Sequence, residues 1–171
     1  EIFIKNLSMI MPVILIAGNH DVNLANKTMS DILSRVFQNL EDRTSRSIKM
    51  RSDMKNIYYL KYSGVYKYNN ILFGLSSLLD GKIIKSLDVN KFEKQKEKII
   101  GLYHGGIGKF KTALGKEMTS DMGIEVFEGY DMVLLGDIHK HQYLDIEKRI
   151  AYASSLIAQD FSETKEDHGL I

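Results

Sequence analysis

The sequence contains no cysteine and only one proline, Pro12. Without cysteine the protein can form neither disulfides nor cysteine-ligated zinc or iron–sulfur centres, and an intracellular location is favoured. No apolar run approaches the roughly 20 residues that cross a membrane, and no signal peptide is recognisable. We therefore expect an intracellular protein that is not secreted and has no membrane partner.

The 171 residues are enough for one domain, and 44% of them are hydrophobic, which allows a sizeable core. The net charge of +1 and the pI near 8.1 neither require nor exclude a nucleic-acid partner. Apolar runs alternate with helical patterns, which is typical of a layered α/β domain. Because the sequence opens on Glu1 and turns at once to apolar-periodic sequence, we expect residues 1–171 to be a single domain and a fragment of a longer protein.

Local sequence patterns predict where the helices and strands of this domain lie. Helical periodicity predicts helices within residues 2–11, 28–42, 88–98 and 124–130, the second of them capped by Thr28 or Ser30. Apolar runs predict strands at 13–17, 98–104 and 132–136, and further strands that begin at 149 and 168. Residues 57–75 are expected to form a hairpin that turns at Tyr68-Asn69-Asn70, and residues 43–55 and 109–123 are expected to be loops.

The stretches VILIAGNHD, KIIGLYHGG and MVLLGDIHKH share one pattern, in which an apolar strand ends and a possible metal ligand follows. Ligands bind at the carboxyl ends of strands in open α/β sheets, so three neighbouring parallel strands would gather these side chains at one edge. The side chains are those of Asn19, His20, His104, Asp137 and His139. Gly18, Gly105, Gly106 and Gly136 would let the backbone approach a small ligand. Imidazole, carboxylate and amide donors suit manganese, iron or zinc better than calcium.

Each motif alone also has a purely structural explanation. Asn19-His20-Asp21 could be a strand-to-helix turn, in which Asp21 holds the imidazole of His20 or caps the next helix. His104 could lie in a plain glycine turn, and Asp137-Ile138-His139 could be a surface loop. His141 is expected to be exposed, and His168 to be a strand residue without a role. Four of the five histidines lie near strand ends, and this co-occurrence favours one shared site.

The order GNHD, YHGG and GDIHKHQ resembles the calcineurin-like metallophosphoesterases. The segment IAYASSLIAQDFSE narrows the resemblance to the DNA double-strand-break repair nucleases of the SbcD type, with phage- and virus-encoded members most similar. The resemblance spans about Pro12 to Ile171. It implies an α-β-β-α sandwich, two divalent metal ions with manganese foremost and iron, zinc or magnesium as alternatives, and a setting in the cytoplasm, the nucleus or a virus.

The resemblance also assigns roles to the strand-end residues. Asn19, His104 and His139 would be metal ligands, and Asp137 stands where the family's Gly-His-x-His motif has its first histidine. A carboxylate can replace an imidazole in a metal shell, so this departure alters metal preference more than it forbids binding. His20 would protonate the leaving oxygen.

A larger departure concerns the motifs that precede GNHD in the family, Asp-x-His and Gly-Asp. The 18 residues before Asn19 contain neither aspartate nor histidine. In addition, the family's Pro-Gly-Ser reads Ala153-Ser154-Ser155 here. We therefore expect the site to be N-terminally incomplete, so that this chain alone binds at most one metal, weakly, and is close to inactive.

The function that the resemblance implies is that of a DNA repair exonuclease subunit, with DNA, an SMC-like coiled-coil ATPase and a second copy of the chain as partners. Two alternatives stay open: a general metallophosphoesterase acting on small phosphoesters or phosphoproteins, and a catalytically inactive scaffold. The basic segment 43–55 could contact DNA phosphates or be a solvated loop. Tyrosines at strand spacing could stack on bases, although sheet packing is the expected role; these are Tyr58, Tyr59, Tyr62, Tyr66 and Tyr68.

Overall fold

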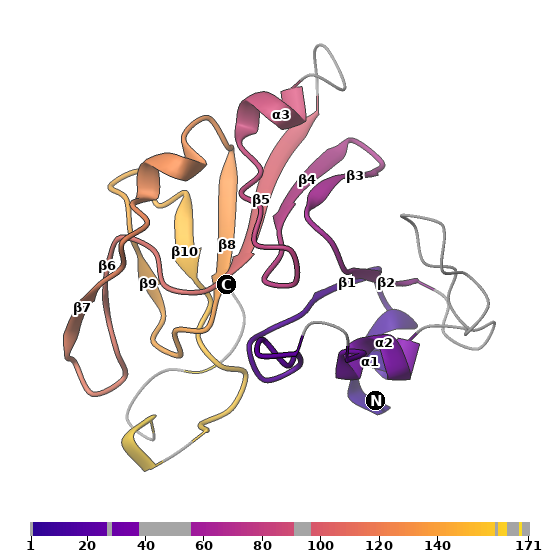
Figure 1. The fold of residues 1–171 in the computed structure, drawn as a ribbon, viewed down its shortest axis with the longest axis horizontal. Helices are drawn as coiled ribbons and strands as arrows, with labels where there is room; N and C mark the ends of the chain where they lie inside the picture. The colour runs from indigo at the N-terminus through magenta and orange to yellow at the C-terminus, as the bar shows by residue number, and fades with distance from the viewer. Residues whose placement is uncertain are drawn as a thin grey trace.

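The computed structural model describes residues 2–26, 29–37, 56–90, 97–159, 161–163 and 168, and it has a mixed α/β architecture (Figure 1). A six-stranded sheet has the order β3-β4-β5-β8-β10-β9. The strands are β3 (Gly64–Tyr68), β4 (Ile71–Ser76), β5 (Lys98–His104), β8 (Met132–Gly136), β10 (Ile150–Tyr152) and β9 (Gln142–Tyr143). The four central strands are parallel to one another, and β3 and β9 are antiparallel edge strands.

A second, two-stranded sheet is formed by β1 (Val13–Ile16) and β2 (Ile57–Leu60), which pair in parallel. Successive side chains of a strand point to opposite faces. On one face, Val13 and Leu15 pack with side chains of the helices α1 (Ile2–Ser8) and α2 (Ile32–Phe37). On the other face, Ile14 and Ile16 pack into the cluster built on three large-sheet residues, Phe73, Leu75 and Leu102. The small sheet therefore lies between the two helices and the large sheet.

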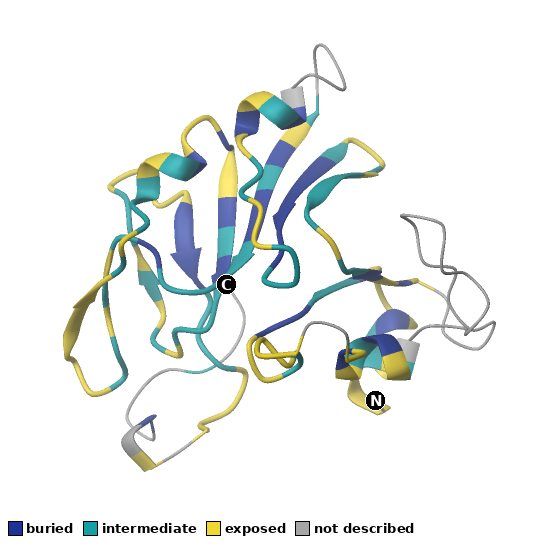
Figure 2. Ribbon diagram, in the orientation of Figure 1, coloured by how far each residue is buried: buried dark blue, intermediate teal, exposed yellow. Residues whose placement is uncertain are grey.

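The opposite face of the large sheet holds the main hydrophobic core. Leu72, Ile99 and Val133 pack there with Val89 of α3 (Ser86–Asn90) and with Phe127 of the 3-10 helix η1 (Ile124–Phe127). Figure 2 shows the buried residues concentrated along the central strands, and β10 is buried throughout. The remaining elements are the hairpin β6 (Lys109–Lys111) and β7 (Glu117–Thr119) and the 3-10 helix η2 (Phe161–Glu163). Within the described residues no helix is long and apolar enough to cross a membrane.

The strands predicted at 98–104 and 132–136 are confirmed, as are the turn at Asn69-Asn70 and the short helix that begins at 124. The hairpin prediction was wrong in one respect: residues 57–60 pair with β1, so only β3 and β4 form the hairpin. Residues 109–123 were predicted as a loop, yet they contain β6 and β7.

The helix predicted within 28–42 begins at Ile32, so Ser30 is not its cap, and Thr28 lies outside the described residues. The carboxylate of Asp31 accepts hydrogen bonds from the amide of Ser34 (2.6 Å) and from the hydroxyl of Ser34 (2.6 Å), as an N-cap side chain does. The helix predicted at 88–98 begins at Ser86. The basic segment 43–55, most of the rest of that helix and the last part of the strand predicted from 168 lie outside the described residues.

Candidate functional site

The carboxyl ends of β1, β5 and β8 meet at one edge of the fold (Figure 1). β5 and β8 are neighbouring parallel strands whose register pairs His104 with Gly136, so Asp137 follows directly beside His104. β1 was expected in the same sheet, but it belongs to the small sheet. Because the small sheet packs on the large one through Ile14 and Ile16, the loop after β1 still reaches the same edge.

Three of the five predicted site residues are joined there by polar contacts. Nε2 of His104 lies 3.1 Å from Oδ1 of Asn19. Nδ2 of Asn19 donates to Oδ1 of Asp137 over 3.3 Å, and Nε2 of His104 lies 3.7 Å from the same oxygen. Because an amide oxygen can only accept, the ring of His104 donates from Nε2 in the first contact. The residues of this cluster are 85 and 118 positions apart in sequence.

The imidazole of His104 lies between two glycines. A Cβ atom added at Gly18 would lie 2.8 Å from Cε1 of His104, and one added at Gly136 would lie 2.6 Å from its Nδ1. These glycines therefore admit the ring of a site residue, whereas the sequence suggested that they bring backbone close to a ligand. Burial lowers the pKa of His104, the negative charges of Asp137 and Asp21 oppose this effect, and the neighbouring imidazoles of His20 and His139 act in the same direction as burial.

The backbone of Asp137 has an unusual, positive φ angle. Its φ of +87° lies in the region that non-glycine residues rarely adopt, although aspartate tolerates it better than most. Such a conformation costs of order 1–3 kcal/mol and persists where surrounding contacts impose it. The hydrogen bond from Asn19 to the carboxylate is one of those contacts.

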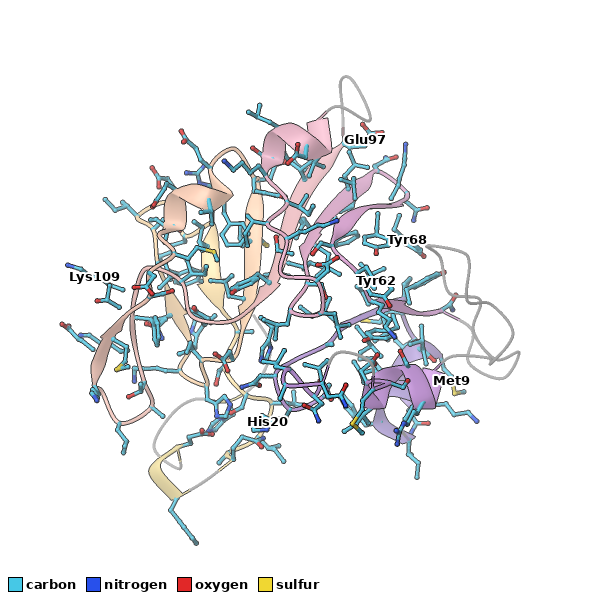
Figure 3. The ribbon with its side chains drawn as sticks, in the orientation of Figure 1. Met9, His20, Tyr62, Tyr68, Glu97 and Lys109 are labelled. Atoms are coloured by element: carbon cyan, nitrogen blue, oxygen red, sulfur yellow. The ribbon has the colours of Figure 1, made fainter. Side chains whose placement is uncertain are left out.

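His20 lies in the exposed turn after β1, below the ends of β5 and β8 in the view of Figure 3. The turn is closed by two contacts between its ends: the amide of Gly18 donates to Oδ2 of Asp21 (2.9 Å), and the amide of Asp21 donates to the carbonyl of Gly18 (3.1 Å). The carbonyl of Asp21 accepts the amide of Ile32 (2.9 Å). Asp21 thus closes the turn that presents Asn19 and His20, and the cap of the next helix is Asp31.

The fifth predicted site residue, His139, has a partner that the sequence did not indicate. Its Nδ1 lies 2.5 Å from Oε1 of Glu163, a carboxylate that is only 2% exposed. Oε2 of Glu163 accepts the amide of Gln159 (2.8 Å) and the hydroxyl of Ser155 (3.1 Å). Burial acts to raise the pKa of Glu163, but these hydrogen bonds outweigh it and hold the pKa below its ordinary value.

His139 does not join the hydrogen-bonded cluster of Asn19, His104 and Asp137. In the part of the chain that the structure describes, no three histidine, aspartate or glutamate side chains gather closely enough to hold a metal ion. The cluster instead combines one imidazole and one carboxylate with the amide of Asn19. Four ligands were predicted at one point, and three of them are brought together.

The other two histidines lie outside this cluster. His141 is exposed, as expected, and its ring packs edge-on against Tyr143 at 5.2 Å. His168 was predicted to be a strand residue without a role; it is not in a strand, and its Nε2 lies 2.9 Å from the carbonyl oxygen of Glu163. It therefore contacts the backbone of the residue that holds His139.

The tyrosines of β2 and β3 are mostly used in packing. The hydroxyl of Tyr59 donates to the buried carboxylate of Asp31 (2.8 Å), and the rings of Tyr58 and Tyr68 meet edge-on at 5.4 Å. The hydroxyl of Tyr66 donates to the carbonyl of Tyr62 (2.6 Å). Of the five, Tyr62 is the most exposed, at 54%. These contacts agree with the packing role expected from strand spacing for Tyr58, Tyr59, Tyr66 and Tyr68, and stacking on bases stays a prediction.

No protein-family model matches the sequence. The chain is similar to a protein of Acanthamoeba polyphaga mimivirus named "Uncharacterized protein R555", with 38% identity over 175 aligned residues. The alignment covers 99% of this chain but only 12% of that viral protein. The chain is thus related, over nearly its whole length, to a small part of a much longer mimivirus protein.

Proposed function

We propose that this chain carries part of the metal site of a phosphodiester hydrolase of the calcineurin-like metallophosphoesterase superfamily, and that the complete protein is a DNA nuclease of the SbcD type. The observation that carries the proposal is the cluster of Asn19, His104 and Asp137, which lie far apart in the sequence and meet at the carboxyl ends of three strands. The placement of the small sheet between two helices and the large sheet agrees with an α-β-β-α sandwich.

The donor atoms of the cluster fit a divalent metal ion. An amide oxygen, an imidazole nitrogen and a carboxylate oxygen form a mixed set that suits manganese, iron or zinc. Asn19, His104 and Asp137 would hold one ion after Nε2 of His104 gives up the proton that it donates to Asn19. His139 stands two residues from Asp137 as a further candidate. Two such ions in the complete site would supply charge stabilisation on the phosphate and activation of water.

The protein's own contribution is to orient the ligands and to place a proton donor. Asn19 donates to Asp137 from Nδ2, which fixes the amide so that its oxygen faces His104. His20 follows Asn19 in a turn closed by Asp21, so its imidazole is exposed beside the cluster. From that position His20 would donate the proton that the leaving oxygen needs.

Manganese binding tests the site directly. We expect the purified chain to bind one Mn²⁺ ion weakly in an electron paramagnetic resonance titration, and the His104→Ala and Asp137→Ala variants each to lose at least about tenfold in affinity. His141→Ala is the matched control, because it removes an exposed imidazole of the same loop outside the cluster. Equal affinity of His104→Ala and His141→Ala would refute the proposed site, and two tightly bound ions would refute the single-metal expectation.

The reaction is tested on the longer parent protein, with Mn²⁺ and with linear DNA or p-nitrophenyl phosphate esters as substrates. We expect cleavage of DNA, and we expect His20→Ala to abolish it while Mn²⁺ binding persists. Loss of both properties together would show that His20 is itself a ligand. Hydrolysis of the small esters alone would favour a general phosphoesterase. DNA, an SMC-like coiled-coil ATPase and a second copy of the chain are the partners that the proposal implies.

One observation favours the alternative of a catalytically inactive scaffold. Among the described residues no three acidic or histidine side chains lie close enough together to hold a metal ion. A scaffold would keep the fold and the cluster without cleaving DNA. A parent protein that neither binds Mn²⁺ nor cleaves either substrate would select this alternative.

A further inference from the structure

The buried carboxylate of Glu163 is fully engaged by hydrogen bonds. Oε1 meets Nδ1 of His139 at 2.5 Å, and Oε2 accepts from the Gln159 amide and the Ser155 hydroxyl. Only 2% of the glutamate is exposed, whereas the side chain of His139 is 44% exposed. Glu163 therefore lies behind the imidazole, and both of its oxygens are already committed to protein donors.

These contacts determine which nitrogen of His139 carries the proton. Both oxygens of an ionised carboxylate can only accept hydrogen bonds. Nδ1 of His139 must therefore donate to Oε1 of Glu163. A neutral imidazole that donates from Nδ1 has an unprotonated Nε2. That nitrogen is then available as a ligand atom on the half-exposed side of the ring.

The backbone of His139 is held at the same place. Its carbonyl accepts the hydroxyl of Ser154 at 2.7 Å, and Ser154 adopts a φ of +80°. The ring and the main chain of His139 are thus fixed by neighbouring residues of one loop, Ser154 and the group formed by Ser155 and Glu163. This is the part of the sequence where the family's Pro-Gly-Ser is replaced by Ala153-Ser154-Ser155.

We propose that Glu163 is a positioning residue for His139: it accepts a hydrogen bond from Nδ1, sets the tautomer and leaves Nε2 unprotonated as a ligand atom for a divalent cation. The proposal rests on the ligand role of His139 in the proposed function. Carboxylates that hold ligand histidines in this way typically change metal affinity by about 10- to 100-fold when they are removed.

The substitution Glu163→Gln should change the tautomer of His139. The backbone amide of Gln159 can only donate, so the oxygen of the new side chain must take the place of Oε2. Its NH₂ group then faces Nδ1 of His139, which must accept. His139 would therefore switch to the tautomer protonated at Nε2, and its available ligand atom would be blocked.

Long-range ¹H–¹⁵N NMR of the metal-free chain distinguishes the two tautomers of His139. We expect the Nδ1-protonated form of His139 in the unmodified chain and in the control Glu147→Gln, which makes the same substitution at an exposed glutamate that contacts Arg149. We expect the Nε2-protonated form in Glu163→Gln. An Nε2-protonated His139 in the unmodified chain overturns the proposal even if Glu163→Gln does not fold, and so does an unchanged tautomer in a folded Glu163→Gln variant.

Mn²⁺ titration of the same three proteins supplies the second readout. We expect Glu163→Gln to bind about tenfold or more weakly than the unmodified chain and Glu147→Gln to bind within about threefold of it. Equal affinities for all three proteins overturn the positioning role. If the unmodified chain binds no Mn²⁺, the proposed metal site falls, and the tautomer comparison still decides whether Glu163 controls His139.

Discussion

Replacing Tyr152 with phenylalanine should loosen the loop that follows His104. Tyr152 is completely buried in β10, and its hydroxyl makes two contacts with that loop. It donates to the carbonyl of Gly105 (2.9 Å) and accepts the amide of Ile107 (2.8 Å). Burial raises the pKa of Tyr152 to about 12, against the opposing effect of the Ile107 amide, so the hydroxyl keeps its proton and donates at neutral pH.

The cost can be worked out from these contacts. Phenylalanine keeps the ring and leaves no cavity of note, so the change is confined to the hydroxyl. Ile107 is 0% exposed, and its amide would be left buried without a partner, which costs about 1–3 kcal/mol. The carbonyl of Gly105 is partly accessible and can turn to water, so it adds little. We expect a loss of about 2 kcal/mol in the free energy of unfolding.

Tyr130→Phe is the matched control. The hydroxyl of Tyr130 only donates, to the carbonyl of Ile84 (2.7 Å), so its removal strands no buried amide and should cost about 1 kcal/mol or less. Urea unfolding of both variants, followed by two spectroscopic probes, gives the comparison. Hydrogen exchange at the Ile107 amide should accelerate in Tyr152→Phe alone. If Tyr152→Phe costs no more than Tyr130→Phe, the reasoning is wrong.

Two further predictions concern the site and the helix cap. Gly136→Ala places a Cβ 2.6 Å from Nδ1 of His104 and should weaken Mn²⁺ binding about as much as His104→Ala, whereas Gly64→Ala, whose Cβ meets nothing nearer than 3.7 Å, should leave titrations unchanged. Burial acts to raise the pKa of Asp31, but hydrogen bonds from Ser34, Lys61 and Tyr59 outweigh it and lower the pKa below 3.8. A lowered carboxyl pKa contributes stability above the unfolded-state value that is lost as pH falls, so urea midpoints should drop below about pH 4 in the unmodified chain and less steeply in Asp31→Asn.

The strands of the large sheet were predictable because parallel strands are buried on both faces and read as continuous apolar runs. Residues 98–104 and 132–136 have this pattern, and both are central strands. The turn at Asn69 was predictable for a local reason as well: its φ of +51° is a conformation that asparagine tolerates.

Strand partners were not predictable in the same way. The sequence IYYL at 57–60 looks like the segment GVYKY at 64–68, since both are rich in aromatic and β-branched residues. Only packing distinguishes them, because Ile57 faces the helices α1 and α2 while Leu60 contacts the large sheet. Sequence periodicity reports which face is apolar, and it does not report which strand lies alongside.

Some residues of the candidate site could likewise be predicted from the sequence, and one could not. Asn19, His104 and Asp137 were predictable because each lies at or just after the end of an apolar strand, and the ends of neighbouring parallel strands meet at one edge. Glu163 could not be predicted, because it lies in an acidic, polar segment, DFSETKED, with no spacing that sets one carboxylate apart. Its importance comes from burial and from its contact with His139, which are properties of the folded chain.

The carboxylate of Asp137 orients the side chain of Asn19. It accepts from Nδ2 of Asn19, and this contact decides which end of the amide faces His104. A neutral imidazole at the same place would bring one acceptor nitrogen and no charge, so the orientation of Asn19 would depend on its tautomer. The negative charge also opposes the effect of burial on His104. In the metal site that we propose, this carboxylate would therefore fix the orientation of the Asn19 amide and add an oxygen donor, which would favour manganese or magnesium over zinc.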